Sequence, residues 1–161
     1  MSLRQLAKCC LALTILAAPA IGQESFQAYT MWLGTDRPLG VLGGGPLNNL
    51  AWLTPEADGG GDRWVQREDG AFLRFSNDAA GPDMCLDVVN GEPFDHFVGL
   101  APCGDFSGQL WTVRQEGPWL RLTNEFLGPD MCLDAFNGGP LDGMVLMAPC
   151  GDYSGQLWQM N

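Results

Sequence analysis

Basic residues are scarce in this sequence. Its 161 residues carry 19 Asp and Glu side chains against eight Lys and Arg, which gives a formal net charge of −11 at pH 7. This balance argues against nucleic-acid binding, because phosphates require a basic surface. The single lysine, Lys8, lies close to the N-terminus, so the rest of the chain has no P-loop, no Schiff-base lysine and no polybasic membrane patch. Neutral or cationic partners fit the charge better.

Long apolar runs are also missing. The longest candidate, residues 9–18, follows two basic residues and is too short for a membrane span of about 20 residues. With the small residues after it, this pattern predicts a secretory signal peptide over residues 1–22, cleaved after Ala20 or Gly22. Its removal lowers the formal net charge to −13 and leaves residues 23–161 as one expected domain. The protein is thus expected to be secreted or periplasmic, with no membrane segment.

Histidine occurs once, at His96, beside Asp95 and not far from Ser107. Such a trio would suit nucleophilic catalysis, but Ser107 is not in a G-x-S-x-G nucleophile elbow. No two carboxylates stand apart as the acid and base of a glycosidase. Dense metal-ligand runs and cofactor motifs are absent as well. We therefore expect a non-catalytic protein without a cofactor or a metal.

The sequence instead contains a threefold repeat. Tryptophan recurs at Trp64, Trp111 and Trp158, 47 residues apart each time, and the intervening segments align without a gap. The three copies are residues 26–72, 73–119 and 120–161. The second and third agree at 25 of 42 positions, whereas the first is diverged but in register. Because a repeat of this size cannot bury its apolar face alone, the three are expected to close on one another.

Short apolar runs separated by Gly, Pro, Asn and Asp are typical of an all-β chain. In the second repeat they predict strands near residues 72–75, 84–89, 97–101 and 109–114. In the third repeat they predict strands near residues 119–122, 131–136, 144–148 and 156–160. Four strands in each of three repeats make twelve, and no helix is expected beyond the leader.

Four of the six cysteines lie in the second and third repeats, at Cys85, Cys103, Cys132 and Cys150. If the repeats share one structure, Cys85 pairs with Cys103 and Cys132 with Cys150, each closing an equivalent loop. An exported chain meets the oxidising conditions that disulfides need. The alternative is a four-thiolate zinc site, although zinc ligands usually come in C-x₂₋₄-C pairs and that spacing does not occur here.

The order of motifs within each repeat resembles that of the ricin B-type lectin family. Cys-x-Asp, then Pro-Cys, then Gln-x-Trp follow one another, and the last motif is complete at residues 109–111 and 156–158. The resemblance implies a β-trefoil with pseudo-threefold symmetry, in which six strands close a barrel and six cap it. It also implies that Trp64, Trp111 and Trp158 lie in the core near the threefold axis, as large apolar rings do by default.

The resemblance further implies a sugar site in each active repeat, where the aspartate of Cys-x-Asp accepts hydrogen bonds from two hydroxyls. Asp87 and Asp134 occupy this position, whereas Gly40 makes the first repeat inactive. Gln109 and Gln156, from Gln-x-Trp, are expected at the same sites. A carboxylate suits vicinal hydroxyls because it accepts at both oxygens. The alternative is structural, with each aspartate bonded to nearby backbone or to the glutamine of its own repeat.

The aromatic platform of the family is absent from its usual position, two residues before the second cysteine, where this chain has Ala101 and Ala148. Sugars bind weakly, so the loss of a stacking ring matters. Other aromatic residues lie close in sequence and are candidate replacements: Phe94, Phe97 and Phe106 in the second repeat, and Phe136 and Tyr153 in the third. Phe106 and Tyr153 occupy the same repeat position, and Tyr153 offers both a stacking face and a hydrogen bond. Packing within their own loop explains both rings equally well.

These observations predict an exported carbohydrate-binding module with up to two weak sites, in the second and third repeats. Two weak sites on one rigid body suit a polymer or a coated surface, where effective concentration raises avidity. The alternative is a trefoil that binds a periplasmic or extracellular protein. The missing platform favours that alternative, as does the strong acidity, which would steer a basic partner.

Overall fold

The computed structural model describes residues 24–53 and 61–161, and the predicted signal peptide, residues 1–22, lies outside this part of the chain. The strands, in chain order, are β1 (Ala28–Thr30), β2 (Leu39–Val41), β3 (Ala51–Leu53), β4 (Trp64–Asp69), β5 (Phe72–Asn77), β6 (Met84–Val88), β7 (Val98–Pro102), β8 (Trp111–Glu116), β9 (Trp119–Asn124), β10 (Gly128–Ala135), β11 (Val145–Pro149) and β12 (Trp158–Met160). Short 3₁₀-helices interrupt them at η1 (Gly34–Asp36), η2 (Ser107–Gln109), η3 (Gly139–Leu141) and η4 (Ser154–Gln156). Among the described residues, no helix has the length and apolar character needed to cross a membrane. The all-β prediction of twelve strands, four from each repeat, is confirmed.

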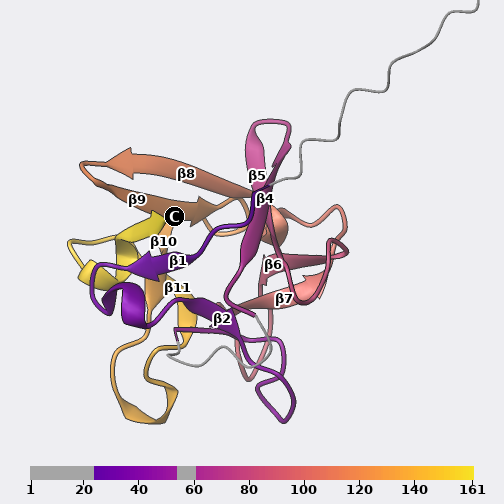
Figure 1. Ribbon diagram of the computed structural model, residues 1–161, viewed down its shortest axis with the longest axis horizontal. Helices are drawn as coiled ribbons and strands as arrows, with labels where there is room; N and C mark the ends of the chain where they lie inside the picture. Colours follow the sequence, from indigo (N-terminus) through magenta and orange to yellow (C-terminus); the bar gives the residue numbers. More distant parts are fainter. Residues whose placement is uncertain (1–23, 54–60) are drawn as a thin grey trace, which may run out of the picture.

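Six strands form a closed antiparallel ring. Within each repeat the chain around the first strand pairs with the last strand, at Phe26 and Trp64, Leu73 and Trp111, and Leu120 and Trp158. Between repeats, β4 pairs with β5 and β8 with β9 as hairpins. β12 pairs with β1 in the same way although no chain connects them, and Figure 1 shows the C-terminus beside β1. The ring therefore closes between the third repeat and the first, which removes exposed edges from these six strands.

The other six strands form three hairpins that contact one another. β2 pairs with β3, β6 with β7, and β10 with β11. The backbone carbonyls of Asn49, His96 and Gly143 each accept a hydrogen bond of 2.8 Å from the following repeat. These residues have φ of 68°, 68° and 84°, a left-handed conformation that Asn, His and Gly adopt more readily than other residues. Three hairpins tied in a cycle to a ring of six strands make a β-trefoil.

The three tryptophans of the repeat lie in the core. Trp64 is 1% exposed, and Trp111 and Trp158 are fully buried. Each indole N–H donates to the backbone carbonyl of a leucine in its own repeat, at 2.8, 3.0 and 2.9 Å: Leu39, Leu86 and Leu133. A buried indole needs such a partner because an unpaired N–H is costly away from water. The surrounding apolar cluster draws side chains from all three repeats.

β8 and β12 begin two residues later than the sequence predicted. Gln109 and Gln156 were expected to start the last strand of their repeats, but they lie in η2 and η4, and β8 and β12 begin at the tryptophans that follow. In η2 the N–H of Gln109 donates to the carbonyl of Phe106 at 3.1 Å. This tight turn accompanies the full burial of the Gln109 side chain. The expectation that no helix follows the leader was wrong at these short turns.

Two disulfides join Cys85 to Cys103 and Cys132 to Cys150. In each, the partners are 18 residues apart in sequence and their Cα atoms are 5.0 Å apart. The predicted pairing is therefore confirmed, and the zinc alternative is wrong because sulfur–sulfur bonds use all four thiols. Each bridge ties the first strand of a hairpin to the segment that follows its second strand.

Candidate functional site

Two pockets lie at equivalent positions in the second and third repeats, with volumes of about 610 and 490 Å³. Asp87, from β6, lines the first pocket, and Asp134, from β10, lines the second. Both pockets also contain a second carboxylate, an aromatic ring, a serine and a glycine from one loop: Asp105, Phe106, Ser107 and Gly108, or Asp152, Tyr153, Ser154 and Gly155. The structure thus brings each predicted aspartate together with the predicted ring of its own repeat.

Gln109 holds Asp87 in place. Its buried amide nitrogen donates to Oδ2 of Asp87 at 3.0 Å and to the carbonyl of Pro102 at 2.9 Å. Its amide oxygen accepts from Nη1 of Arg74 at 2.8 Å and from the N–H of Gly104 at 3.0 Å. Both donors and both acceptor positions of the amide are thereby filled. Gln109 therefore orients the carboxylate and keeps no free polar atom for a ligand.

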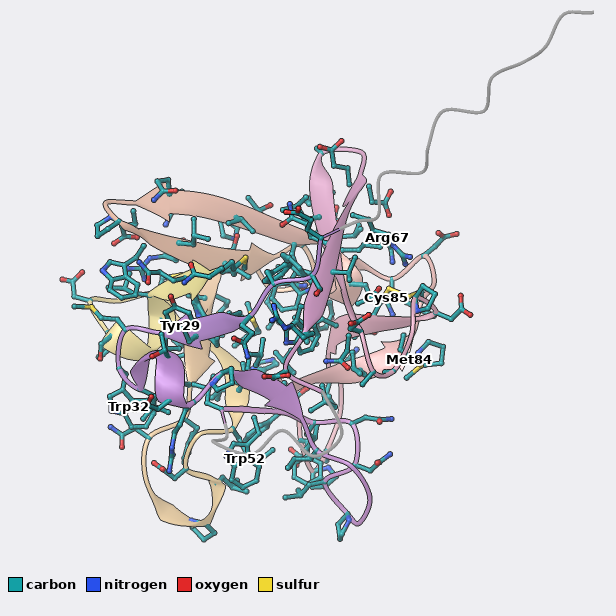
Figure 2. All side chains as sticks on the ribbon, in the orientation of Figure 1. Tyr29, Trp32, Trp52, Arg67, Met84 and Cys85 are labelled. Atoms are coloured by element: carbon teal, nitrogen blue, oxygen red, sulfur yellow. A yellow bond between two sulfur atoms is a disulfide. The ribbon has the colours of Figure 1, made fainter. Side chains whose placement is uncertain are left out.

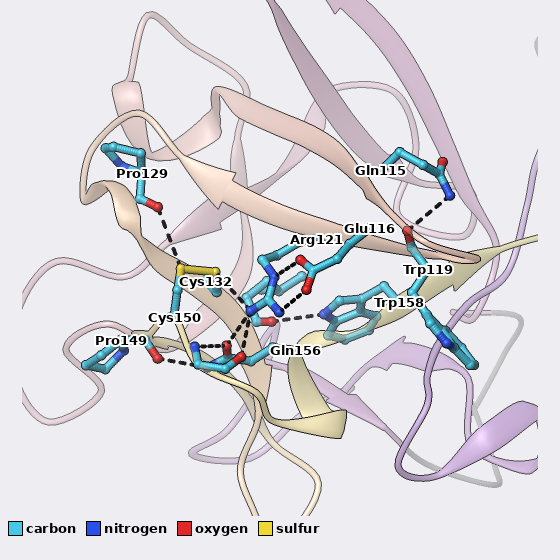
Figure 3. Close-up of polar contacts among 12 residues, drawn as sticks. Gln115, Glu116, Trp119, Arg121, Pro129, Cys132, Pro149, Cys150, Gln156 and Trp158 are labelled. Carbon is cyan, nitrogen blue, oxygen red and sulfur yellow. Dashed lines mark hydrogen bonds and ion pairs between the residues drawn. A yellow bond between two sulfur atoms is a disulfide. The ribbon is translucent and has the colours of Figure 1, made fainter.

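The third repeat contains the same arrangement. Gln156 is fully buried, donates to Oδ2 of Asp134 at 3.0 Å and accepts from Nη1 of Arg121 at 3.0 Å. Arg121 is only 4% exposed and is fixed by two hydrogen bonds to Glu116, at 2.5 and 2.8 Å. Figure 3 shows the guanidinium of Arg121 between Glu116 and Gln156. A chain of four polar side chains thus leads from an exposed carboxylate to the aspartate of the pocket.

The two glutamines were predicted among the ligand contacts, and their burial gives them a different position. Neither Gln109 nor Gln156 lines a pocket, and both are fully buried behind the aspartates. The structural alternative for Asp87 and Asp134, a bond to the glutamine of the same repeat, is present in the structure. That bond uses Oδ2, so it coexists with a place in the pocket wall.

Burial raises the pKa of both pocket aspartates above the ordinary value of 3.8. The hydrogen bonds from Gln109 and Gln156 lower the pKa and offset part of this increase. A carboxylate that has lost water gains from any hydroxyl that donates to it. The environment therefore makes both aspartates good acceptors for a ligand.

Glycine makes room for the second oxygen of each carboxylate. A Cβ atom on Gly108 would lie 2.2 Å from Oδ1 of Asp87, and one on Gly155 would lie 2.5 Å from Oδ1 of Asp134. A Cβ atom this close would force the carboxylate to move from its present position. The glycine before Gln-x-Trp is therefore part of what fixes the aspartate in each pocket.

Exposed apolar side chains gather at the two pockets. Phe106 and Tyr153 are 59% and 62% exposed, and Phe126 and Phe136 are 39% and 37% exposed. All four line a pocket, which leaves Met31 as the other large apolar side chain exposed in the described residues. Apolar surface concentrated around a concave site is typical of ligand binding.

Sequence reasoning missed two aromatic residues that line the pockets, Phe126 and Trp32. They lie at corresponding positions of the third and first repeats, where the second repeat has Ala79. Figure 2 shows Trp32 beside the turn that precedes η1. Alignment of the repeats shows an aromatic residue at this position in two of the three copies, but it does not show which pocket the ring faces.

Residues 71–161 match the protein family described as the ricin-type beta-trefoil lectin domain. The chain belongs to this family. The matched segment holds the second and third repeats, with both disulfides and both pocket aspartates. The resemblance found in the sequence motifs is therefore confirmed.

Solved structures similar to this lectin-family chain share its fold at low sequence identity. The designed threefold-symmetric protein ThreeFoil has 18% identity and a TM-score of 0.69, over 84% of this chain and 96% of its own. A ricin B-like lectin of Macrolepiota procera, in complex with lactose, has 16% identity and a TM-score of 0.65, over 86% of this chain and 95% of its own. A GlcNAcα1-4Gal-releasing endo-β-galactosidase from Clostridium perfringens has 12% identity and a TM-score of 0.67, and the match covers 84% of this chain but only 31% of that enzyme. No curated protein sequence matches the chain.

The first repeat of this lectin-family chain lacks the polar network. Gly40 stands in β2 at the position of Asp87 in β6, and Asp62 replaces the buried glutamine. Asp62 accepts a hydrogen bond from Gln27, which occupies the position of Arg74. The first repeat thus has an amide at the arginine position and an acid at the glutamine position, and the position that carries the pocket carboxylate in the later repeats has no side chain.

Proposed function

We propose that this protein binds carbohydrate, without catalysis, through the pockets of its second and third repeats. Asp87 and Asp134 accept hydrogen bonds from sugar hydroxyls, while Phe106 and Tyr153 pack against the apolar face of the sugar. One observation carries this proposal: both pockets combine a half-buried carboxylate, held by a buried glutamine, with exposed aromatic rings. Sugar sites need both kinds of contact. The lactose in the Macrolepiota procera complex supports the same class of ligand.

The surroundings of the one histidine support a non-catalytic function. His96 occupies the left-handed position of a hairpin loop, where its carbonyl accepts from the N–H of Met147 at 2.8 Å. Its Nε2 lies 3.5 Å from a carboxylate oxygen of Asp95 in the same loop. Ser107 lines the pocket of the second repeat, whereas His96 lines neither pocket. The serine and the histidine therefore do not line one pocket together, as a nucleophile and its base would.

We propose that the protein is exported and acts in the periplasm or outside the cell. The signal-peptide pattern of residues 1–22 supports this, and so do the two disulfides, which persist in oxidising compartments. Two sites on one rigid trefoil favour a repeating or densely displayed glycan, because the second contact forms at high effective concentration. Affinity for a polymer should therefore exceed that for a single sugar unit.

A glycan array tests the proposal with a charge-matched pair of variants. Residues 23–161, with the cysteines oxidised, are compared with the Asp87→Ala, Asp134→Ala double variant. The control is Asp83→Ala, Asp130→Ala, which removes two exposed carboxylates from the same two repeats. Binding should be lost in the first variant and kept in the second.

The second candidate function is a trefoil that binds another protein. The alanines at the usual platform position and the net charge of −13 for residues 23–161 favour that candidate. Silence of the unaltered protein on the array, together with salt-sensitive capture of a basic protein, would replace sugar binding by protein binding. Glycan binding that survives the double variant would place the sugar elsewhere on the trefoil.

A further inference from the structure

Each pocket has a second aromatic wall that comes from the next repeat. The pocket of the second repeat is lined by Phe126, in the turn after β9, and the pocket of the third repeat by Trp32, in the turn after β1. Ala79 occupies this turn in the second repeat, at the junction with the inactive first repeat. An aromatic ring is therefore present at the two junctions where the preceding repeat keeps its pocket aspartate, and absent at the third.

Backbone hydrogen bonds fix this turn against the preceding repeat. The N–H of Glu125 donates to the carbonyl of Leu110 at 2.9 Å, and the N–H of Met31 donates to the carbonyl of Leu157 at 2.8 Å. Each acceptor is the middle residue of Gln-x-Trp, directly after the glutamine that holds the pocket aspartate. The chain that carries the ring is thus set in register with the pocket by main-chain atoms.

Asn124 adds a side-chain link at the pocket of the second repeat. It is 2% exposed, its Nδ2 donates to the carbonyl of Gly108 at 2.8 Å, and its Oδ1 accepts from the N–H of Phe126 at 2.9 Å. Gly108 and Phe126 both line this pocket. One buried amide therefore holds two of its walls, from different repeats, at a fixed separation.

We infer that each bound sugar ring lies between two aromatic side chains from different repeats. These are Phe106 and Phe126 in one pocket, and Tyr153 and Trp32 in the other, where Phe136 of the third repeat also lines the wall. The inference rests on the proposed carbohydrate function. The ring from the next repeat supplies the stacking surface that the alanines before the second cysteine do not.

The charges of the pockets select the class of sugar. Asp87 and Asp105 line one pocket, Asp134 and Asp152 line the other, and no Lys, Arg or His lines either within the described chain. An acidic sugar is repelled by such a pocket. A neutral or amine-bearing sugar meets carboxylate acceptors and aromatic faces, both of which favour hydroxyl hydrogens and cations.

Variants that keep only one pocket aspartate allow the ring from the next repeat to be tested in each pocket separately, in the oxidised protein. In the Asp87→Ala background, which leaves the pocket of the third repeat, Trp32→Ala should weaken binding about tenfold by loss of a stacked ring. In the Asp134→Ala background, Phe126→Ala should have a similar effect. Met31→Ala is the control in both, because that side chain is 50% exposed and lines neither pocket. Calorimetric titration uses lactose, a glucosamine oligomer and an oligogalacturonate as neutral, cationic and acidic probes.

The change in tryptophan emission on addition of sugar reports binding at one pocket, and a folding defect would not produce such a sugar-dependent change. Trp32 is the one tryptophan that lines either pocket in the described residues. Sugar binding should shift the emission of the Asp87→Ala protein and leave that of the Asp134→Ala protein unchanged. Trp32→Phe keeps a ring for stacking, so it should retain most of the affinity and abolish the shift.

Failure of the inference and failure of the proposed function give different results. If Asp134→Ala removes binding at the third repeat while Trp32→Ala and Phe126→Ala have no effect, the cross-repeat wall is wrong and sugar binding stands. If the unaltered protein binds neither these probes nor any glycan of the array, both are wrong. Tighter binding of the oligogalacturonate than of the other two probes would overturn the ligand class.

Discussion

The first repeat and the two later repeats share their backbone bonds and differ in their buried polar side chains. In all three, the tryptophan donates to a leucine carbonyl at 2.8 to 3.0 Å, and one hairpin carbonyl accepts from the next repeat at 2.8 Å. These bonds end on main-chain oxygens, so no side chain of the accepting residue takes part in them. The Arg-Gln-Asp network depends on three specific side chains, and in the first repeat these positions hold Gln27, Asp62 and Gly40.

This comparison shows that closure of the trefoil and formation of the pocket network depend on separate residues. A repeat can lose the network and still supply its strands if the replaced polar groups find partners. In the first repeat, the bond from Gln27 to Asp62 meets that need. No buried side-chain nitrogen or oxygen lacks a hydrogen-bond partner in the parts of the chain that the structure describes.

The largest expected effect concerns the disulfides, which the later repeats have and the first lacks. Replacing Cys85 and Cys103 by alanine should lower the free energy of unfolding by about 3 kcal/mol, because the bridge restricts the unfolded chain. Urea unfolding of the oxidised protein measures the loss. Pro38→Ala, at the position of Cys85 in the first repeat, is the control and should cost much less. Equal stability of the double cysteine variant and the parent would contradict the prediction.

A smaller loss is expected when the buried guanidinium of the third repeat is removed. Arg121→Met takes donors from Gln156 and from the carbonyl of Gly151, and leaving such acceptors unpaired costs about 1–3 kcal/mol. Sugar binding at this repeat should weaken too, because Gln156 then orients Asp134 less well. Gln27→Met, the matched change in the first repeat, should lower stability less and leave binding intact. Similar losses from both variants would show that the networks are not specific to the later repeats.

Acid should abolish sugar binding by the later repeats, with a midpoint at a pH above the ordinary pKa of aspartate. Burial raises the pKa of Asp87 above 3.8, so the carboxylate becomes protonated, and loses its acceptor charge, at milder acidity than a free aspartate. Binding should thus improve as the pH rises through this range, whereas the contribution of Asp87 to stability should fall. The reason is that a pKa raised in the folded state favours folding of the protonated form. Titration of the Asp134→Ala protein with the best array glycan, with circular dichroism as the control for folding, measures the midpoint. A midpoint at or below 3.8 would contradict the role given to Asp87.

The smallest expected effect is at the first repeat, where adding the missing acid should create no site. In Gly40→Asp the new carboxylate stands at the position of Asp87. The residue at the position of Gln109 is Asp62, so the new carboxylate gains no amide donor. Adding Asp62→Gln and Gln27→Arg should restore the network and recover stability. Even then no third sugar site should appear, because Ala79 gives this junction no ring. A third binding equivalent in calorimetry would show that the aspartate network alone is sufficient.

The sequence predicted the fold well because the fold depends on features that repeat. The spacing of Trp64, Trp111 and Trp158 identified the period, and the period fixed the disulfide pairing without knowledge of the strands. The start of β8 was predicted two residues too early, since burial of the Gln109 side chain requires a turn that strand periodicity does not reveal. Local patterns give the period of a strand, while its exact ends depend on tertiary contacts that the pattern does not contain.

The pocket could be predicted only in part from the sequence. Asp87, Asp134 and the rings of their own loops follow from motifs within one repeat. Phe126 and Trp32 line pockets that belong to the preceding repeats, the latter through the pairing of β12 with β1 across the two ends of the chain. Alignment of the repeats places both rings at one position but contains no information on which surface they face.

The position of each pocket at a junction has a consequence for how such a protein can change. A gene duplication that copies one whole repeat transfers the aspartate side of one pocket and the aromatic side of another. Exchange of a repeat between two trefoils therefore alters the walls of two pockets at once, whereas a crossover placed between the Gln-x-Trp motif and the following turn would separate the two walls of one pocket. The unit inherited by recombination and the set of residues that lines one pocket do not coincide in this architecture.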